Sequence, residues 1–359
     1  MNFTTNAKIL AAHLAILKLS TAAKNKNMPI LGCVLVKVEG SVATLATTDL
    51  DTTTAATVFA HDTFDGAICI PVKAFVDALK GVVKGDVKIE RTAGFKVRLT
   101  HDAGESVLLA LSADEFPALK TTPELGIKLN PARFRDALNA TLYAASKDET
   151  RYNLNGVFVD ANNMVATDGH RMVRVQGETG FTGESILPRK GLEILTRVLA
   201  KAVDPLLTND RTTNVNENHQ HFKCGAFAIA MRLVDGQFPN YQQVIPKLND
   251  KSVSFDHAVL LAALKRCDRN TFAPCKITMA LETGVVFSQV NPDTGENKIN
   301  VVAVATHPFE IALNASYLYE AIENSTSGVV TLRMSDNLSP ILVESGLTGT
   351  VAVIMPIRL

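Results

Sequence analysis

Two short runs of this sequence carry acids and a histidine at spacings from which acid–base or metal chemistry could be built. A carboxylate beside an imidazole can act as a general acid–base pair, and both groups can bind a metal ion. The residues are Asp49 and Asp51 in one run and Asp168 and His170, within Ala166-Thr167-Asp168-Gly169-His170-Arg171-Met172, in the other. Asp-Gly is also a strong hairpin-turn signal, because Asp tolerates left-handed backbone geometry and Gly adopts it freely. We therefore predict that these acids are turn residues.

A second candidate for chemistry is the segment His219-x-His221-x-x-Cys224. Its spacing is loosely metal-like, but no convincing fourth ligand accompanies it, so we interpret it as structural. The sequence also lacks a nucleophile elbow, a phosphate loop and a paired-carboxylate signature. A hydrolase that uses the Asp and His residues is therefore the weaker hypothesis, and we expect no catalysis, no metal and no cofactor.

Length and composition are those of a multidomain intracellular protein. The 359 residues predict two or three domains, and Lys plus Arg equal Asp plus Glu at 36 each. No apolar run reaches the ~18 residues of a membrane span, and the first residues do not resemble a signal peptide. The cysteines, odd in number and without a CxxC pair, indicate reduced thiols in the cytoplasm. They are Cys33, Cys69, Cys224, Cys267 and Cys275.

The elements that must position these residues recur along the chain. Apolar spacing and Asn or Pro near helix starts predict six helices, each followed by three strand-like runs. The helices are expected at 7–20, 72–84, 131–147, 188–201, 257–269 and 315–324. After the fourth helix, the strands are expected at Leu206–Thr208, Thr213–Asn216 and Phe222–Met231.

Short anchor motifs show that this order is an internal repeat. Phe116-Pro117 and Phe238-Pro239 lie 122 residues apart, and Thr48-Asp49 and Thr167-Asp168 lie 119 apart. A third, weaker copy completes three units of about 120 residues, each with two helix-plus-strands motifs. We therefore expect three tandem α+β domains, 1–120, 121–246 and 247–359. Repetition of this kind favours a ring, a solenoid or an array over a single-cleft enzyme.

Positive charge is concentrated in the predicted helices. They hold 15 Lys and Arg but six Asp and Glu, so their net charge is +9 in a chain that is neutral overall. One interpretation is ordinary solvated helix faces. The other is that the helices face one polyanion, through phosphate contacts that are independent of sequence and sensitive to salt. The sixth helix, with Glu320 and Glu323 and no basic residue, departs from the pattern.

The order and spacing of seven motifs resemble the bacterial DNA sliding clamps, the β subunits of DNA polymerase III, over the full chain. The motifs are Met28-Pro29-Ile30-Leu31-Gly32, Thr48-Asp49-Leu50-Asp51, Phe116-Pro117, Arg151-Tyr152-Asn153-Leu154-Asn155-Gly156, Ala166-Thr167-Asp168-Gly169-His170-Arg171, Phe238-Pro239-Asn240-Tyr241 and Met355-Pro356-Ile357-Arg358-Leu359. The resemblance implies three domains of the DNA-clamp fold in a head-to-tail homodimer. Helices would line the inside of a closed ring around duplex DNA, sheets would form its outside, and the ring would tether the replicative polymerase without chemistry of its own.

The resemblance also implies three sets of site residues. A pocket for a short hydrophobic peptide of the polymerase, the clamp loader and other partners would comprise Leu154, Thr167, Gly169, His170, Arg171, Met172, Pro239, Val244, Val353, Met355, Pro356, Ile357, Arg358 and Leu359. With the helix charge, it places Lys24, Lys26, Lys73, Lys80, Arg133, Arg135, Lys147, Arg151, Tyr152, Arg197, Lys201 and Lys265 near double-stranded DNA. The dimer contact would involve Ser106, Leu108, Cys267 and Asp268.

Two departures from the family pattern stand out. Gln242-Gln243 occupies positions where the family often has Arg-Arg, which removes positive charge beside the pocket. Cys267-Asp268, opposite Ser106 and Leu108, puts polar groups where the family's dimer contact is apolar. A repeat scaffold of the same fold that binds only protein remains the alternative, and the basic helices argue against it.

Overall fold

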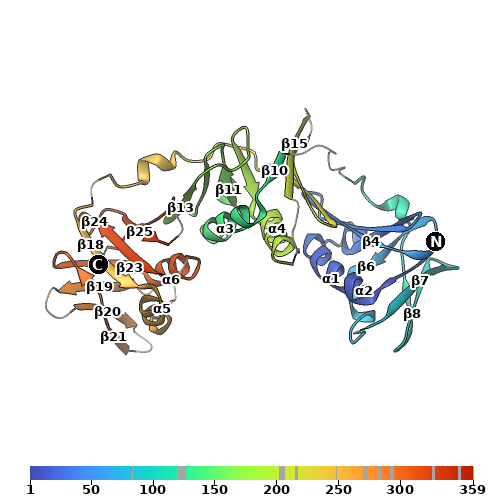
Figure 1. Cartoon of the computed structure of the whole chain (residues 1–359), viewed down its shortest axis with the longest axis horizontal. Coiled ribbons are helices and arrows are strands. Elements are labelled where there is room, and N and C mark those ends of the chain that lie inside the picture. The colour runs from blue at the N-terminus through green and yellow to red at the C-terminus, as the bar shows by residue number, and fades with distance from the viewer. Residues whose placement is uncertain are drawn as a thin grey trace. The chain divides into compact units, whose positions relative to one another are not determined.

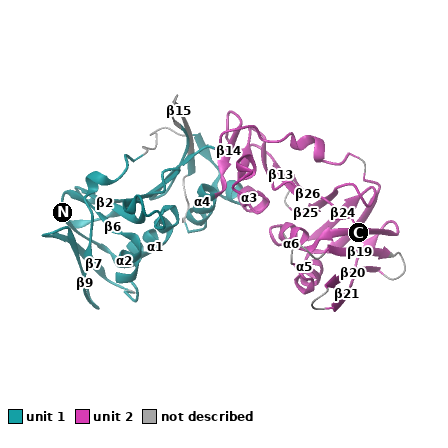
Figure 2. Cartoon of the chain, turned by 180° about the vertical axis from the view of Figure 1, so that it is seen from behind, with its two compact units in different colours: residues 1–135, 190–233 teal, residues 136–189, 234–359 magenta. Residues whose placement is uncertain are grey.

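The computed structural model describes residues 1–82, 84–119, 127–201, 207–214, 217–247, 249–269, 274–280, 284–291, 295–325, 328–346 and 349–358 (Figure 1). The fold is α+β. The chain forms two compact units, one of residues 1–135 and 190–233 and the other of residues 136–189 and 234–359 (Figure 2). The middle third of the sequence is thus divided between the units, whereas the sequence repeat predicts three equal segments.

The repeating motif is a strand, a helix and three further strands. In the first copy these are β1 (Asn2–Asn6), α1 (Ala7–Leu17), β2 (Cys33–Glu39), β3 (Val42–Thr48) and β4 (Thr52–Phe59). The second copy consists of β6 (Gly66–Pro71), α2 (Val72–Ala78), β7 (Asp86–Thr92), β8 (Lys96–His101) and β9 (Gly104–Leu109). The sequence prediction of a helix and three strands was therefore incomplete, because it missed the strand that leads into each helix.

In the first unit, each leading strand joins the trailing strands of the other motif. The five-stranded sheet has the order β5-β1-β7-β8-β9, with β5 at His61–Phe64. The eight-stranded sheet has the order β10-β15-β16-β17-β4-β3-β2-β6. Its strands from the middle of the chain are β10 (Ile127–Leu129), β15 (Leu207–Asn214), β16 (Glu217–Cys224) and β17 (Phe227–Arg232). Antiparallel pairing of β17 with β4 makes this sheet continuous across two sequence repeats.

The second unit follows the same plan. Its nine-stranded sheet has the order β14-β11-β12-β13-β26-β25-β24-β18-β22, and its four-stranded sheet the order β21-β20-β19-β23. The strands are β11 (Gly156–Val159), β12 (Asn163–Thr167), β13 (Arg171–Gln176), β14 (Ser185–Pro188), β18 (Lys251–Asp256), β19 (Pro274–Ala280), β20 (Gly284–Asn291), β21 (Gly295–Val301), β22 (Val304–Ala305), β23 (Phe309–Asn314), β24 (Val329–Met334), β25 (Ile341–Ser345) and β26 (Thr350–Ile354). Here β13 pairs with β26 antiparallel, from Arg171 opposite Ile354 to Val175 opposite Thr350.

Three of the helices begin where a leading strand ends in a capping residue. Asn6, Asp256 and Asn314 accept hydrogen bonds from main-chain N–H groups of the first turn, which have no partner inside the helix. Within the first unit α1 packs against α2, and within the second α5 (His257–Arg266) packs against α6 (Ala315–Glu323). The apolar stripe of α1, including Leu10, Leu14 and Leu17, is fully buried. The remaining helices are α3 (Pro131–Leu142) and α4 (Arg189–Lys201).

The helices are shorter than the sequence predicted. Of the 15 basic residues assigned to them, ten lie inside the α-helices, which hold five acids, so their net charge is +5. The five beyond the helix ends are Lys18, Lys80, Lys84, Lys147 and Arg269. The predicted single strand Phe222–Met231 was also wrong: it is a hairpin of β16 and β17, turning at Gly225 with a φ of 56°.

Candidate functional site

The stretch from Thr167 to Arg171 forms the predicted hairpin turn between β12 and β13. The Asp168 carboxylate accepts hydrogen bonds from the main-chain N–H of His170 (2.9 Å) and of Arg171 (3.1 Å). The Thr167 hydroxyl accepts one from the N–H of Gly169 (3.1 Å), whose φ is 90°. The aspartate therefore holds the turn, and the glycine adopts a conformation that other residues rarely take.

The same turn recurs at Thr48–Thr52 in the first unit. Asp49 accepts from the N–H groups of Asp51 and Thr52, and Thr48 accepts from Leu50. Leu50 takes the place of the glycine with a φ of 84°, an uncommon conformation for a residue with a side chain. The acids proposed as alternative catalytic groups are thus turn residues, as the repeat predicted. The Gly-His-Arg sequence belongs to the second copy alone, although the turn is the same.

Arg171 extends this turn into a charged network within the second unit. Its guanidinium donates to the carboxylates of Asp168 (3.0 Å from Nε) and Glu320, and to the carbonyl of Tyr143 (3.0 Å from Nη2). It also lies 4.5 Å from the ring centroid of Tyr317, a favourable cation–π distance. The Arg171 side chain is 9% exposed, so it fixes the turn against α6 rather than offering a free charge to a ligand.

The C-terminal segment meets this turn directly. The N–H of Met355 donates to the carbonyl of His170 (2.9 Å), which continues the pairing of β13 with β26. Two residues later, the N–H of Ile357 donates to the carbonyl of Ala312 on β23 (2.8 Å). The structure therefore brings together the two segments that the sequence assigned to one pocket.

A hollow of about 460 Å³ lies next to Met355. Two of the predicted pocket residues, Val244 and Met355, line it, and these residues are 44% and 41% exposed. Six lining residues were not predicted: Gln243, Pro246, Lys247, Ser335, Ser339 and Pro340. The three from Ser335 to Pro340 lie in the loop between β24 and β25, which carries no motif that singles it out in the sequence.

The other predicted pocket residues differ in accessibility. Leu154, Met172 and Val353 are buried, the last two in the core cluster beneath the strand pairing, so they support the surface from within. Those at least partly exposed are Thr167, Gly169, His170, Arg171, Pro239, Pro356, Ile357 and Arg358. Leu359 lies outside the described residues. Sequence reasoning also missed Tyr143, Tyr317 and Glu320, which contact Arg171 from distant segments.

The residues assigned to DNA, which are eleven basic residues and Tyr152, lie mostly at the surface. Eleven of the twelve are exposed, and Arg135 is half-buried. Arg151 has a second role, because its guanidinium donates to the Asp168 carbonyl (3.0 Å) and to the Asp148 carboxylate (3.2 Å). Lys80 pairs with Asp77 at 2.6 Å. These contacts leave the side chains of Arg151 and Lys80 solvated and able to meet phosphates.

The four residues assigned to the dimer contact are buried or half-buried in the single chain. Cys267 is buried, and Asp268 is held by hydrogen bonds to Gln289 and from Asn291 (2.7 Å each). Ser106 and Leu108 are half-buried on β9. Their neighbours Val107 and Leu109, on the opposite face of that strand, are 53% and 71% exposed.

The second chemical candidate has no support in the structure. His219 and His221 are buried in β16. Across the described ranges, no three His, Cys, Asp or Glu side chains gather closely enough to hold a metal ion. No helix within those ranges is long and apolar enough to cross a membrane.

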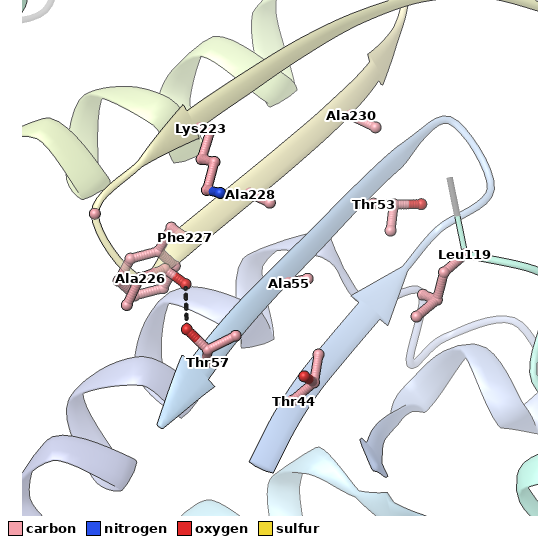
Figure 3. Close-up of a pocket in the computed structure, with 11 residues that line it drawn as sticks. Thr44, Thr53, Ala55, Thr57, Leu119, Lys223, Ala226, Phe227, Ala228 and Ala230 are labelled. Atoms are coloured by element: carbon pink, nitrogen blue, oxygen red, sulfur yellow. Dashed lines mark hydrogen bonds between the residues drawn. The ribbon is translucent and has the colours of Figure 1, made fainter. Parts of the chain in front are cut away.

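A second hollow, of about 380 Å³, lies on the eight-stranded sheet of the first unit. Small side chains of β3, β4 and β17 line most of it, with Leu119 and Lys223 at its sides (Figure 3). The Thr57 hydroxyl donates to the Ala226 carbonyl at 3.5 Å across its end (Figure 3). None of the predicted pocket, DNA or dimer residues lines it.

Comparison with known proteins agrees with the motifs and the fold. Models of the N-terminal, central and C-terminal domains of the DNA polymerase III beta subunit match residues 1–120, 128–240 and 242–358. The beta sliding clamp of Vibrio cholerae is 28% identical over 353 residues, covering 94% of this chain and 95% of the relative. That of Pseudomonas putida is 29% identical and covers both chains fully.

Solved structures of sliding clamps are also similar to this chain over its full length. The sliding clamp of Pseudomonas aeruginosa bound to griselimycin has a TM-score of 0.88 at 26% identity, with both chains fully covered. The Bartonella birtlesii clamp, also bound to griselimycin, has a TM-score of 0.89 at 25% identity, again with full coverage of both. The chain belongs to the bacterial DNA polymerase III beta-subunit family, the DNA sliding clamps, which are non-catalytic processivity factors of DNA replication.

Proposed function

We propose that two copies of this chain close into a ring by pairing β21 of one with β9 of the other. Inside the chain, neighbouring repeats are joined by one pair of strands. The last strand of the first motif in one repeat pairs with the last strand of the second motif in the next repeat, as β4 does with β17 and β13 with β26. The same rule applied once more pairs β21 with β9, and both are sheet edges in the described chain. Made twice, this head-to-tail contact closes a dimer of six repeats. We place the domain boundaries at 1–120, 121–246 and 247–359.

The surface chemistry of β9 supports this joint. Val107 and Leu109 are exposed apolar residues on an edge strand, which is an aggregation hazard unless a partner covers it. On the other face of β9, Ser106 and Leu108 lie on the side of α2, while Asp268 follows the end of α5, which packs on β21. Both faces of the joint would then stabilise the dimer, one through apolar contacts and the face beside the helices through hydrogen-bonding groups.

The ring would encircle duplex DNA and hold it loosely. The exposed basic residues Lys73, Arg133, Arg197, Lys201 and Lys265 on the helices provide phosphate contacts without base recognition. Loose contacts suit a ring that slides, because tight or base-specific contacts would stop it. Processivity then follows from topology: a polymerase tethered to a ring stays at high effective concentration near the primer end.

Partners would dock in the second unit, in the hollow between Val244 and Met355. Uncovered apolar side chains in a groove suit the anchors of an extended peptide, and Met can repack for different ligands. The replicative polymerase and the clamp loader are the expected owners of such peptides. Two related clamps that have been solved with griselimycin bound support a family surface that accepts ligands.

Sedimentation of the full chain tests the ring joint. We expect a dimer for the native chain and a monomer for Leu109→Asp, because a charge in the strand pairing would be desolvated without a partner. Phe59→Asp is the matched control, since Phe59 is 73% exposed on β4 in the same unit and should leave the dimer intact. A native monomer, or the same state for both variants, would contradict the proposed joint.

A further inference from the structure

The hollow on the eight-stranded sheet of the first unit lies where the sequence repeat has small side chains in place of large ones. Part of its lining comes from the pairing of β17 with β4, where Ala230 lies opposite Thr53. At the spacing of the two aspartate turns, the matching pair of the second unit is Met172 opposite Val353. Both of these larger side chains are buried in a core cluster. The first unit therefore lacks the side-chain volume that fills this sheet face in the second.

The segment that follows each repeat also differs at this face. Tyr241 follows Phe238-Pro239 in the second unit, and both aromatic rings contact Phe158, with centroids 5.1 Å away for Phe238 and 6.0 Å for Tyr241. Leu119 follows Phe116-Pro117 at the same spacing and lies at the side of the hollow (Figure 3). The second unit thus covers this sheet face with its own aromatic side chains, whereas the first unit has a hollow of about 380 Å³ there.

The apolar surface continues past the hollow along β3 and β4. Phe59 follows Thr57, a lining residue, by two positions, so both face the same side of the sheet. Val42 lies opposite Phe59 on β3, and the two residues are 41% and 73% exposed. From Thr53 to Phe59 this face of β4 spans about 20 Å. A small molecule would occupy the hollow alone, so the longer apolar surface favours an extended segment of a partner protein.

Lys223 provides the charge at the hollow. It lies opposite Ala228 in the pairing of β16 with β17, and its side chain lies at the side of the hollow (Figure 3). The residue is exposed, and its ammonium forms no ion pair with any residue that the structure describes. The described lining residues of this hollow include no acid. An unpaired ammonium beside an apolar hollow attracts a carboxylate and disfavours a second cation.

From these features we propose that this face of the first unit binds an extended segment of a partner protein, with a bulky apolar side chain in the hollow and an acidic side chain at Lys223. The small side chains of Thr53 and Ala230 leave the room for the apolar anchor. The site is separate from the docking hollow beside Met355, because that hollow belongs to the second unit.

Fluorescence anisotropy with the full chain tests the proposal. The probes are fluorescein-labelled, serine-rich peptides with one Phe, flanked by Asp, Asn or Lys on the N-terminal side in one series and on the C-terminal side in another. They are measured with the Val244→Asp variant, which places a charge in the hollow beside Met355 and so removes binding there. In at least one series, the Asp peptide should bind about two- to fivefold more tightly than the Asn peptide, the range for a partly exposed ion pair. The Lys peptide should bind most weakly.

Two further substitutions, each made in the same Val244→Asp chain, assign the binding to the hollow. Ala228→Leu fills it and should weaken binding of the Asp peptide about tenfold, because the apolar anchor loses its buried contacts. Lys223→Met should abolish the preference for Asp over Asn. Hydrogen exchange with the bound Asp peptide should be slower in β4 and β17, the strands that line the hollow.

Two matched controls should keep both the affinity and the preference. Lys37→Met removes an exposed lysine of the same sheet that already pairs with Glu39. Ala305→Leu adds the same volume at a half-buried alanine of β22 in the second unit. Circular dichroism verifies that each variant is folded.

Three outcomes would overturn the proposal. Equal affinity with and without Ala228→Leu would show that the anchor does not enter the hollow. A preference for Asp that survives in Lys223→Met would remove the role of that lysine. Slower exchange confined to the second unit, or failure of every peptide to bind, would contradict the site as a whole.

Discussion

Arg171→Ala should release the turn at Asp168 from α6. The native guanidinium joins the Asp168 and Glu320 carboxylates and the Tyr143 carbonyl, and its side chain is 9% exposed. Removing one partner of a buried, hydrogen-bonded ion pair costs about 3–5 kcal/mol. Glu320 keeps a side-chain exposure of 33%, and Asp168 keeps two main-chain donors, so the cost falls at the lower end, about 3 kcal/mol.

Hydrogen exchange followed by mass spectrometry measures this locally in the full chain. A local loss of about 3 kcal/mol corresponds to roughly 100-fold faster exchange in segments that open together. The faster exchange is expected in β13 and α6, which Arg171 connects, while the first unit keeps native rates. Arg171→Lys should fall between native and Ala, because an ammonium cannot serve three acceptors in the fork geometry of a guanidinium.

Arg333→Ala provides the matched control. Arg333 also donates from Nε to a glutamate, Glu344, at 2.8 Å in the same unit, but the two side chains are 43% and 45% exposed. An exposed pair contributes about 0–1 kcal/mol, so exchange should change less than about fivefold. Equal exchange rates in the two alanine variants would refute the argument that burial of the Arg171 network fixes the turn.

Three further outcomes are expected. Gly156→Ala should lower the free energy of unfolding in urea by about 1–3 kcal/mol, because a Cβ there would clash with the Leu187 carbonyl across the strand pair. Gly183→Ala is the control and should be neutral, because the space around Gly183 is open. Equal urea midpoints for the two variants would contradict this prediction. Burial raises the pKa of Cys33 to about 11 and of Cys69 to about 12, so both thiols should resist alkylation near pH 8 until the chain unfolds. The stability of the fold should also decline as pH rises from 9.0, the ordinary thiol pKa, toward 11, because the unfolded chain then loses thiol protons that the folded chain keeps. Fast alkylation of these two thiols in the native state would contradict the predicted rise in their pKa. Reversing the charge of Lys73, Arg133 and Arg197 together should weaken DNA retention and reduce its salt dependence, measured by filter binding across a salt series; an unchanged salt slope would mean that these side chains do not meet phosphates.

The sequence predicted the repeat well because its anchors are local. The turns at Asp49 and Asp168 are each closed by residues no more than three positions away, so the run of residue types is enough to identify them. The leading strands were missed because they are short, and three of them end in helix-capping residues, among them Asn6 and Asn314, which a sequence pattern assigns to loops. The turn at Gly225 was the signal for the missed hairpin.

The division into two units could not be predicted from local patterns. It depends on pairing between strands far apart in the chain, such as β4 with β17 and β13 with β26. The candidate site likewise contains residues that local patterns identify and residues that only the fold identifies. The segments around Asp168 and Met355 were assigned by their motifs, whereas Tyr317 and Glu320 have an ordinary helical pattern, and only the folded chain brings them to Arg171.

The central claim is that the chain holds DNA by enclosing it. The most direct measurement is retention of the loaded protein on a nicked circular plasmid, compared with the same plasmid after linearisation, at low and at high salt. Enclosure predicts that the protein stays on the circle even at high salt, where phosphate contacts are lost, and slides off once the plasmid has ends. Equal retention on circular and linear DNA, or release from the circle at high salt, would contradict the account.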